Sequence, residues 1–133
     1  MTGDERNKKQ TGSNPPVHLL PNREAAIVEI AKLRDYCLNP ESPRGQHNAR
    51  VFATALELTA ENADELRKAI LDGIQLYEAA SGASDIYGQR YTVDMQLIHQ
   101  DRKAWVRTGW IVRTEEAFPR LPTCDIVREK SDE

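Results

Sequence analysis

The chain has 133 residues, of which 39% are hydrophobic and 29% charged, and its net charge is −3. This length corresponds to one domain, large enough to bury a core without disulfides or metals. The acidic balance argues against a protein that coats nucleic acid, but it leaves room for a small basic cleft. No apolar run approaches the ~18 residues of a membrane span. The N-terminus lacks a hydrophobic signal segment, so we expect a cytoplasmic protein or one exported without a leader.

The cysteines and histidines fit no zinc template. Cys37 and Cys124 form no CxxC pair, and the three histidines are scattered along the chain. We therefore expect two reduced thiols in or near the core, no metal and no cofactor.

Both ends of the chain are polar. Residues 1–20 contain almost no apolar side chains before Val17 and are expected to form a flexible tail, and residues 128–133 a second one. The single domain is then expected over residues 21–127.

The first structured element is ambiguous. Asn22 is placed to cap a helix whose apolar residues recur at helical spacing up to Cys37. The stretch 26–28 is also compatible with a short strand before a shorter helix. Either element must end by Asn39, because Pro40 disfavours helical geometry in the residue before it. Residues 39–45 are then a turn-rich loop.

A basic stretch follows this loop and begins the next helix. From Ser42 to Leu56 there is no Asp or Glu, and the helical spacing from Gln46 places His47, Arg50 and Thr54 on one face. Arg44 and Gly45 stand at the start of this helix, where free amides and the helix dipole favour an anion.

The longest helix is expected over residues 60–80, ended by Gly82. Its apolar stripe runs from Ala63 to Tyr77. Its other face is acidic and is the surface we would assign to a basic protein partner; the charged residues there are Glu61, Asp64, Glu65, Asp72 and Glu78 against Arg67 and Lys68.

The C-terminal part alternates as strands do. Residues 91–97 and 104–113 form two half-buried strands around a hairpin loop at 99–103, and residues 120–127 form a third, with Pro122 indicating an edge or a bulge. Trp105 and Trp110 fall on opposite faces, so at most one belongs to the core, and the other is expected either to stack on a base or to cover the sheet edge. The sequence therefore predicts an α+β fold, with N-terminal helices packed on one face of a three- to four-stranded antiparallel sheet.

The chain lacks the P-loop, GxGxxG, HExxH and GxSxG motifs. What remains are scattered basic and hydroxyl side chains, which suit phosphate binding or metal-free cleavage of RNA. The candidate catalytic residues are His47, Arg50, Arg107 and Thr123, and the candidate phosphate-binding residues are Arg44, Gly45, Asn48 and Arg120. A lone histidine on a helix is more often structural than catalytic, and Arg107 is more often a solvated sheet arginine.

Five segments together resemble one bacterial family, the domain of unknown function six-eight-eight-three, which also occurs fused to toxin-like or phage-associated chains. They are residues 32–39, 43–52, 87–91, 106–112 and 119–124. The layout of this family is similar to metal-independent toxin ribonucleases of the barnase, colicin and RelE types, a fold-level analogy. The resemblance also implies a lysine where this chain has Asn48, which would weaken catalysis here.

Two functions are therefore open. One is an RNA- or phosphate-directed, toxin-like domain whose basic side chains converge on one cleft. The other is a non-catalytic protein-binding module of the immunity, adaptor or phage accessory type, which would use the acidic helix face. The sequence does not predict an oligomeric state.

Overall fold

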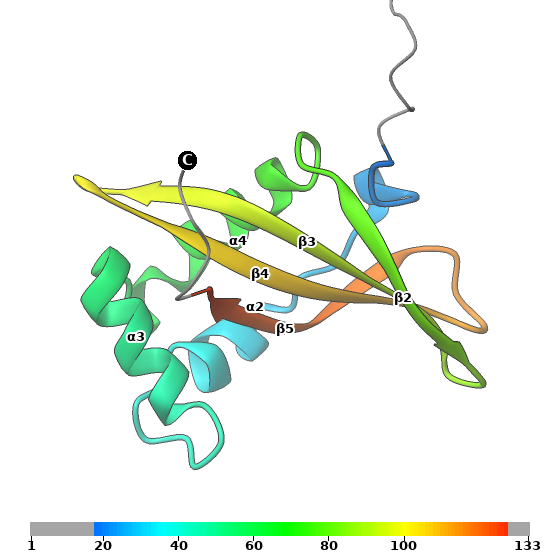
Figure 1. Ribbon diagram of the computed structural model, residues 1–133. Coiled ribbons are helices and arrows are strands. Elements are labelled where there is room, and N and C mark those ends of the chain that lie inside the picture. The colour runs from blue at the N-terminus through cyan, green and yellow to red at the C-terminus, as the bar shows by residue number, and fades with distance from the viewer. Residues whose placement is uncertain (1–17, 128–133) are drawn as a thin grey trace, which may run out of the picture.

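The computed structural model describes residues 18–127, so the tails expected at 128–133 and over most of 1–20 lie outside the described residues. Figure 1 shows helices gathered beside an extended, twisted sheet. The elements in chain order are a 3₁₀ turn Arg23–Ala25, α2 Ile30–Lys32, a π-helical turn Leu33–Cys37, α3 Gln46–Leu56, a 3₁₀ turn Ala60–Asn62, α4 Ala63–Gly73, β2 Ala79–Asp85, β3 Gly88–His99, β4 Arg102–Arg113 and β5 Pro119–Ile126.

The sheet has four strands in the order β2-β3-β4-β5, and each neighbouring pair is antiparallel. Sequential antiparallel strands need only short connections, which explains why strands follow one another without helices between them. The fold class is therefore α+β, as the sequence predicts.

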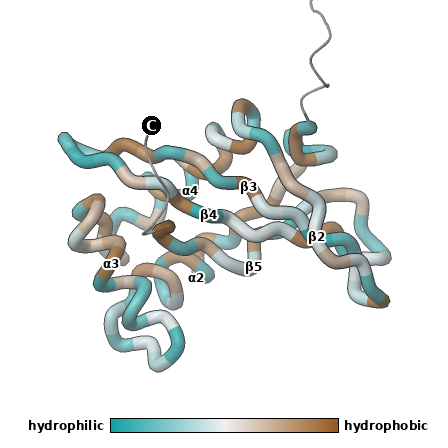
Figure 2. The backbone as a smooth tube through the Cα atoms, in the orientation of Figure 1, coloured by the Kyte–Doolittle hydropathy of each residue, from teal (hydrophilic) through white to brown (hydrophobic). Residues whose placement is uncertain are grey.

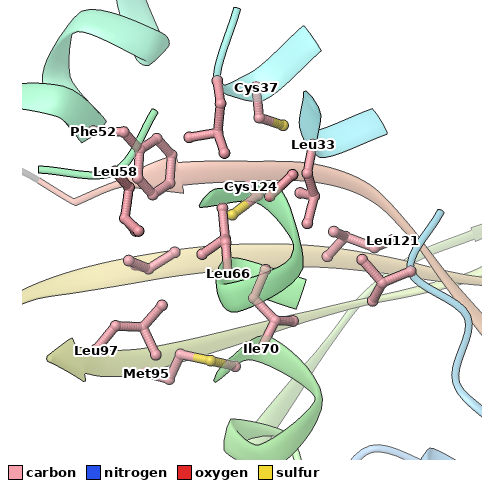
Figure 3. Close-up of a cluster of buried hydrophobic side chains, with 14 of the residues drawn as sticks. Leu33, Cys37, Phe52, Leu58, Leu66, Ile70, Met95, Leu97, Leu121 and Cys124 are labelled. Atoms are coloured by element: carbon pink, nitrogen blue, oxygen red, sulfur yellow. The ribbon is translucent and has the colours of Figure 1, made fainter. Parts of the chain in front are cut away.

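One face of the sheet carries the core. Val93 and Met95 of β3 and Val106 and Trp110 of β4 are buried, because alternate residues of a strand point to the same side. They pack against the helices and the segments between them, and Figure 3 shows side chains of both layers meeting. Trp110 is thus the core tryptophan, whereas Trp105 lies on the other face.

The two cysteines belong to this core, as expected. Cys37 and Cys124 are free and buried. Burial is the largest cause that raises the pKa of Cys37 to about 11, and burial likewise raises the pKa of Cys124. Both thiols are therefore protonated near neutral pH.

Helices α3 and α4 are amphipathic, with buried apolar residues on one face and polar residues on the other. Figure 2 shows hydrophilic and hydrophobic residues interleaved along the described backbone. None of the helices between residues 18 and 127 is long and apolar enough to cross a membrane.

The sequence allows either one long helix after Asn22 or a short strand at 26–28 followed by a shorter helix. In the structure the helix begins only at Ile30. Ile27 instead forms a parallel bridge to Arg120, with its amide donating to the carbonyl of Pro119 at 2.9 Å. This pairing takes residues 26–28 out of helical geometry, which favours the short-strand alternative. The capping role predicted for Asn22 is wrong, because its side chain bonds no helical amide and donates to the carbonyl of Ala117 instead.

The prediction of a helix up to residue 80 is also wrong, because α4 ends at Gly73. A Cβ at Gly73 would lie 2.4 Å from Sδ of Met95, so α4 approaches β3 closely here and a larger residue would require the Met95 side chain to move. The small residues that follow pair with β3 as strand β2, and Gly82 lies within this strand rather than at a helix end. Tertiary pairing decides the conformation here, not helix propensity.

Candidate functional site: a basic groove between α3 and β4

Helix α3 forms because its two faces have different partners. Ala49, Phe52 and Leu56 are buried against the core, at the i, i+3, i+7 spacing of one helical face. His47 and Arg50 lie on an exposed face. The helix begins after Gly45, whose amide donates to Oγ of Ser42 at 3.2 Å.

Hydrogen bonds attach α3 to the sheet at both ends. Near its start, Nδ2 of Asn48 donates to the carbonyl of Cys124 in β5 at 2.7 Å. Near its end, Arg102 of β4 donates to the carbonyl of Thr54 at 3.2 Å. Figure 1 shows α3 beside the end of the sheet at which β5 finishes and the β3–β4 hairpin turns. The position of α3 relative to β4 and β5 is therefore fixed by named contacts.

A groove of about 540 Å³ lies along this boundary, and we call it the basic groove. It is lined by His47, Arg50, Val51, Thr54 and Ala55 of α3, Lys103, Ala104 and Trp105 of β4, and Ile126 and Val127 at the end of β5. No carboxylate is among these residues, although the chain carries a net charge of −3. The basic groove combines an apolar floor with cations on both walls.

Within the described residues, no carboxylate pairs with the basic side chains of the groove. Nη2 of Arg50 donates to Oε1 of Gln46 at 3.0 Å, a neutral acceptor. Among residues 18–127, neither Arg50, Lys103 nor His47 forms an ion pair with Asp or Glu. An anion that enters the groove therefore meets charges that no carboxylate of residues 18–127 pairs with.

Trp105 borders the groove on the side of the sheet. Its ring meets that of Tyr77 edge to face, with centroids 6.0 Å apart, which fixes the indole in place. It also lines a second hollow, in which the carboxylates of Glu78 and Asp94 are present. The indole thus separates a basic region from an acidic one.

Two of the candidate phosphate-binding residues, Arg44 and Gly45, pack the loop before α3 against Tyr36. Nη1 of Arg44 donates to the hydroxyl of Tyr36 at 3.2 Å. Gly45 is buried, and a Cβ there would lie only 1.9 Å from the carbonyl oxygen of Tyr36. Glycine is thus required at this position for packing, and neither residue lines the basic groove.

Arg107 is held by a carboxylate on the outer face of the sheet. Its guanidinium makes two hydrogen bonds to Asp94, at 2.8 and 2.9 Å. This bidentate pair raises the pKa of Arg107, and partial burial raises that of nearby Asp125. Thr123 pairs with Gly109 on the neighbouring strand and is exposed.

Arg120 is the centre of a separate cluster. It binds Glu116 at 2.9 and 3.1 Å and Glu29 at 3.2 Å, and its guanidinium lies 5.2 Å from the ring centroid of Phe118. It lines another hollow, together with Ile111. Its contacts tie β5 to the segment before α2.

Of the eight candidate residues, the structure brings His47 and Arg50 together, and it places the others elsewhere. Sequence reasoning missed Lys103 and Trp105 as parts of the same groove. Lys103 was assigned to a hairpin loop, but the turn is shorter: β3 continues to His99 and β4 begins at Arg102. The alternation of residues 103 and 105 was the signal that places both on one side of a strand.

The acidic helix face is partly engaged within the protein. Glu65 accepts a hydrogen bond from Asn62 at 2.9 Å, and Asp72 pairs with Lys68 at 2.9 Å. In the described part of the chain, no group of three or more His, Cys, Asp or Glu side chains gathers to hold a metal ion.

Comparisons with known proteins give one match. The family model described as "Domain of unknown function (DUF6883)" matches residues 19–127. No curated protein and no solved structure matches, so the likeness to toxin ribonucleases stays a prediction. The match covers most of the chain, and the chain therefore belongs to the DUF6883 family.

Proposed function

We propose that this domain binds a phosphate-bearing ligand in the basic groove, and that the ligand is single-stranded RNA. The observation that carries the proposal is the lining of the groove: Arg50, Lys103 and His47 around an apolar floor, with no carboxylate among the lining residues. Phosphate recognition needs cations that are free to pair with an anion.

The wall positions suit an extended ligand rather than a single ion. Arg50 comes from α3 and Lys103 from β4, so the cations stand on opposite walls of the groove. Between them lie Val51, Ala55 and Trp105, which offer apolar and aromatic surface to a base. Cations that follow a backbone and an aromatic surface for stacking are the usual parts of a site for single-stranded nucleic acid.

Cleavage would require more than the groove offers. A base must take the proton of the 2′-hydroxyl while an acid protonates the leaving oxygen. His47 is the histidine that lines the groove, and it has no second histidine or carboxylate beside it there. Binding is therefore the function we propose, with cleavage left as an outcome of the test below.

Asn48 has a different part in this proposal from the one its sequence position suggests. Its side chain reaches the carbonyl of Cys124 and does not line the groove. The resemblance implies lysine at this position, and an ammonium is a donor too. We infer that Asn48 supports α3 and that its replacement of a lysine leaves the cations of the groove unaltered.

The test is binding of a fluorescein-labelled uridine octamer, followed by anisotropy at 50 to 200 mM salt. We expect the logarithm of the affinity to fall linearly with the logarithm of the salt concentration, with a slope of about −0.7 for each phosphate bound. Arg50→Gln should weaken binding. The matched control is Arg34→Gln, which should leave the affinity unchanged. Arg34 is an exposed arginine of the π-helical turn Leu33–Cys37 and pairs with its neighbour Asp35.

Equal loss in both variants, or no binding of the octamer at 50 mM salt, would contradict the proposal. The same samples, run on a gel after incubation, report on cleavage. Product formed by the wild type and lost in His47→Gln would extend the proposal from binding to catalysis.

The acidic helix face is a weaker candidate for a partner. Of the five carboxylates predicted on this face, Glu65 and Asp72 are already hydrogen-bonded within the protein, and Glu78 lies beyond the end of α4. No observation on the described residues favours this surface over the groove.

A further inference from the structure

Two side chains of the β3–β4 hairpin form hydrogen bonds with the C-terminal end of α3. His99 and Arg102 are opposite one another in the register, next to the turn. Nδ1 of His99 lies 2.7 Å from the carbonyl oxygen of Leu56. Arg102 donates to the carbonyl of Thr54 at 3.2 Å and to Oε2 of Glu57 at 3.0 Å. We call this set the hairpin–helix contact.

This contact answers a need of the helix. The last carbonyls of an α-helix have no intrahelical partner, and the negative end of its dipole favours cations. The chain turns here through Glu57 in the left-handed region at φ 56°, and the amides of Glu57 and Leu58 bond back to Ala53 and Phe52. The hairpin side chains supply donors for carbonyls that this turn leaves open.

The basic groove begins immediately beside the contact. Thr54 and Ala55 line the α3 wall, and Lys103 and Ala104 line the β4 wall. Arg102 is the residue next to Lys103, and it bonds the backbone of Thr54 directly. The contact therefore fixes the separation of the two walls at this end, as Asn48 does at the other.

The ring of His99 has acceptors on both sides. Its Nδ1 faces the Leu56 carbonyl, and its Nε2 lies 3.2 Å from Oε1 of Glu65 in α4. A neutral imidazole has one N–H and one lone pair, so it can donate to only one of these acceptors. The protonated ring donates to both. Arg102 and Glu57 carry charge within the same contact, and Asp101 lies two residues from His99 in the chain.

From this geometry we infer that His99 and Arg102 are positioning residues for the basic groove, and that protonation of His99 tightens the grip on α3 and strengthens ligand binding. The inference rests on the proposed function of the groove. Neither residue lines the groove, so both act through the placement of α3 against β4. Histidine side chains in general change charge between about pH 5 and 8, so the test covers this range.

The test must separate His99 from His47, since both are histidines and His47 lines the groove itself. All binding is therefore measured in a His47→Gln background, with the labelled uridine octamer as the probe, from pH 8.0 to pH 5.5 at fixed salt. We expect the affinity to rise by roughly 3- to 10-fold over this range, the size of one ordinary hydrogen bond gained at a partly exposed site. Adding His99→Gln should flatten the profile.

Two further variants distinguish positioning from mere stability. Glu65→Gln keeps an acceptor but removes its charge, and should reduce the rise on acidification. Arg102→Gln should weaken binding by a similar factor at every pH, because arginine side chains in general stay charged throughout this range. The same pH profile with and without His99 would overturn the inference.

If the octamer does not bind at any pH, the proposed function fails, and amide exchange then tests the positioning inference alone. Protection of the Glu57 and Leu58 amides, corrected for the intrinsic pH dependence of exchange, should increase on acidification in the His47→Gln protein. It should not increase after His99→Gln. Protection that is independent of pH, or of His99, would contradict the inference.

Discussion

The basic groove and the outer face of the sheet both contain arginines, yet they differ in what those arginines touch. Arg50 in the groove bonds a neutral glutamine side chain. Arg107 on the outer face is held by both oxygens of Asp94, and Arg120 is held by Glu116 and Glu29. In the sequence these residues look alike. In the structure, Arg107 and Arg120 have carboxylate partners, whereas Arg50 has a neutral one.

The difference has a physical basis. A guanidinium already bound by a carboxylate must lose that partner before it can hold a phosphate, so its net gain is small. A cation whose partner is neutral loses far less. Four predictions follow from the contrast between the groove and the outer arginines.

The largest expected effect comes from reversing the charges of the groove. Arg50→Glu with Lys103→Glu should lower the affinity for the uridine octamer roughly 30-fold or more at 0.1 M salt, because two attractive contacts become repulsive. Lys32→Glu with Arg34→Glu changes the net charge equally on another surface and is the control. A similar loss in the control would show that net charge, not the groove, governs binding.

Removing the attachment at the start of α3 should lower stability. Asn48→Ala deletes the hydrogen bond to Cys124 and leaves that carbonyl without this donor, which should cost about 1 kcal/mol in the free energy of unfolding. Urea denaturation measures the change. Asn48→Lys should recover part of it, whereas a lysine variant no more stable than the alanine variant would argue against the supporting role.

A smaller effect is expected when Arg107 loses its charged partner and comes to resemble the arginine of the groove. Asp94→Asn weakens the hold on Arg107, which lines the hollow on the other side of Trp105. We expect the octamer to bind roughly 3-fold more tightly, since a further cation becomes available near the groove. Arg107→Gln in the otherwise wild-type protein should leave the affinity unchanged. If Asp94→Asn leaves the affinity unchanged, the ion pair with Asp94 is not what keeps Arg107 from contributing to octamer binding.

The smallest effect concerns the Arg120 cluster. Hydrogen bonding to Arg120 is the first cause that lowers the pKa of Glu116. A lowered pKa in the folded state gives stability that is present at neutral pH and is lost as the pH falls through that pKa. Arg120→Gln should therefore unfold at lower urea than wild type at pH 7, with the gap closing below about pH 4. RNA binding should not change.

Much of the fold follows from local pattern. The alternation in residues 91–97 and 104–113 identifies the buried faces of β3 and β4, since the residues of one face are buried and those of the other are more exposed. The helical spacing of Ala49, Phe52 and Leu56 identifies the inner face of α3 in the same way. In each of these segments a single hydrophobic periodicity is enough to predict the conformation.

The errors arise where distant residues decide. The stretch 79–85 becomes β2 because β3 offers it backbone partners, and Ile27 leaves the helix because β5 does the same. The candidate site shows the same limit. The pairing of Arg107 with Asp94 spans two strands, and that of Arg120 with Glu29 spans 91 residues, so neither is visible in local spacing.

The most direct test of the groove is a chemical-shift map of the isotope-labelled protein titrated with unlabelled uridine octamer. The account predicts that the largest changes fall on the amides of Arg50 and Lys103 and on the indole N–H of Trp105, with Arg120 unaffected. Changes centred on Arg120, or none at millimolar octamer in low salt, would contradict the assignment of the basic groove as the binding site.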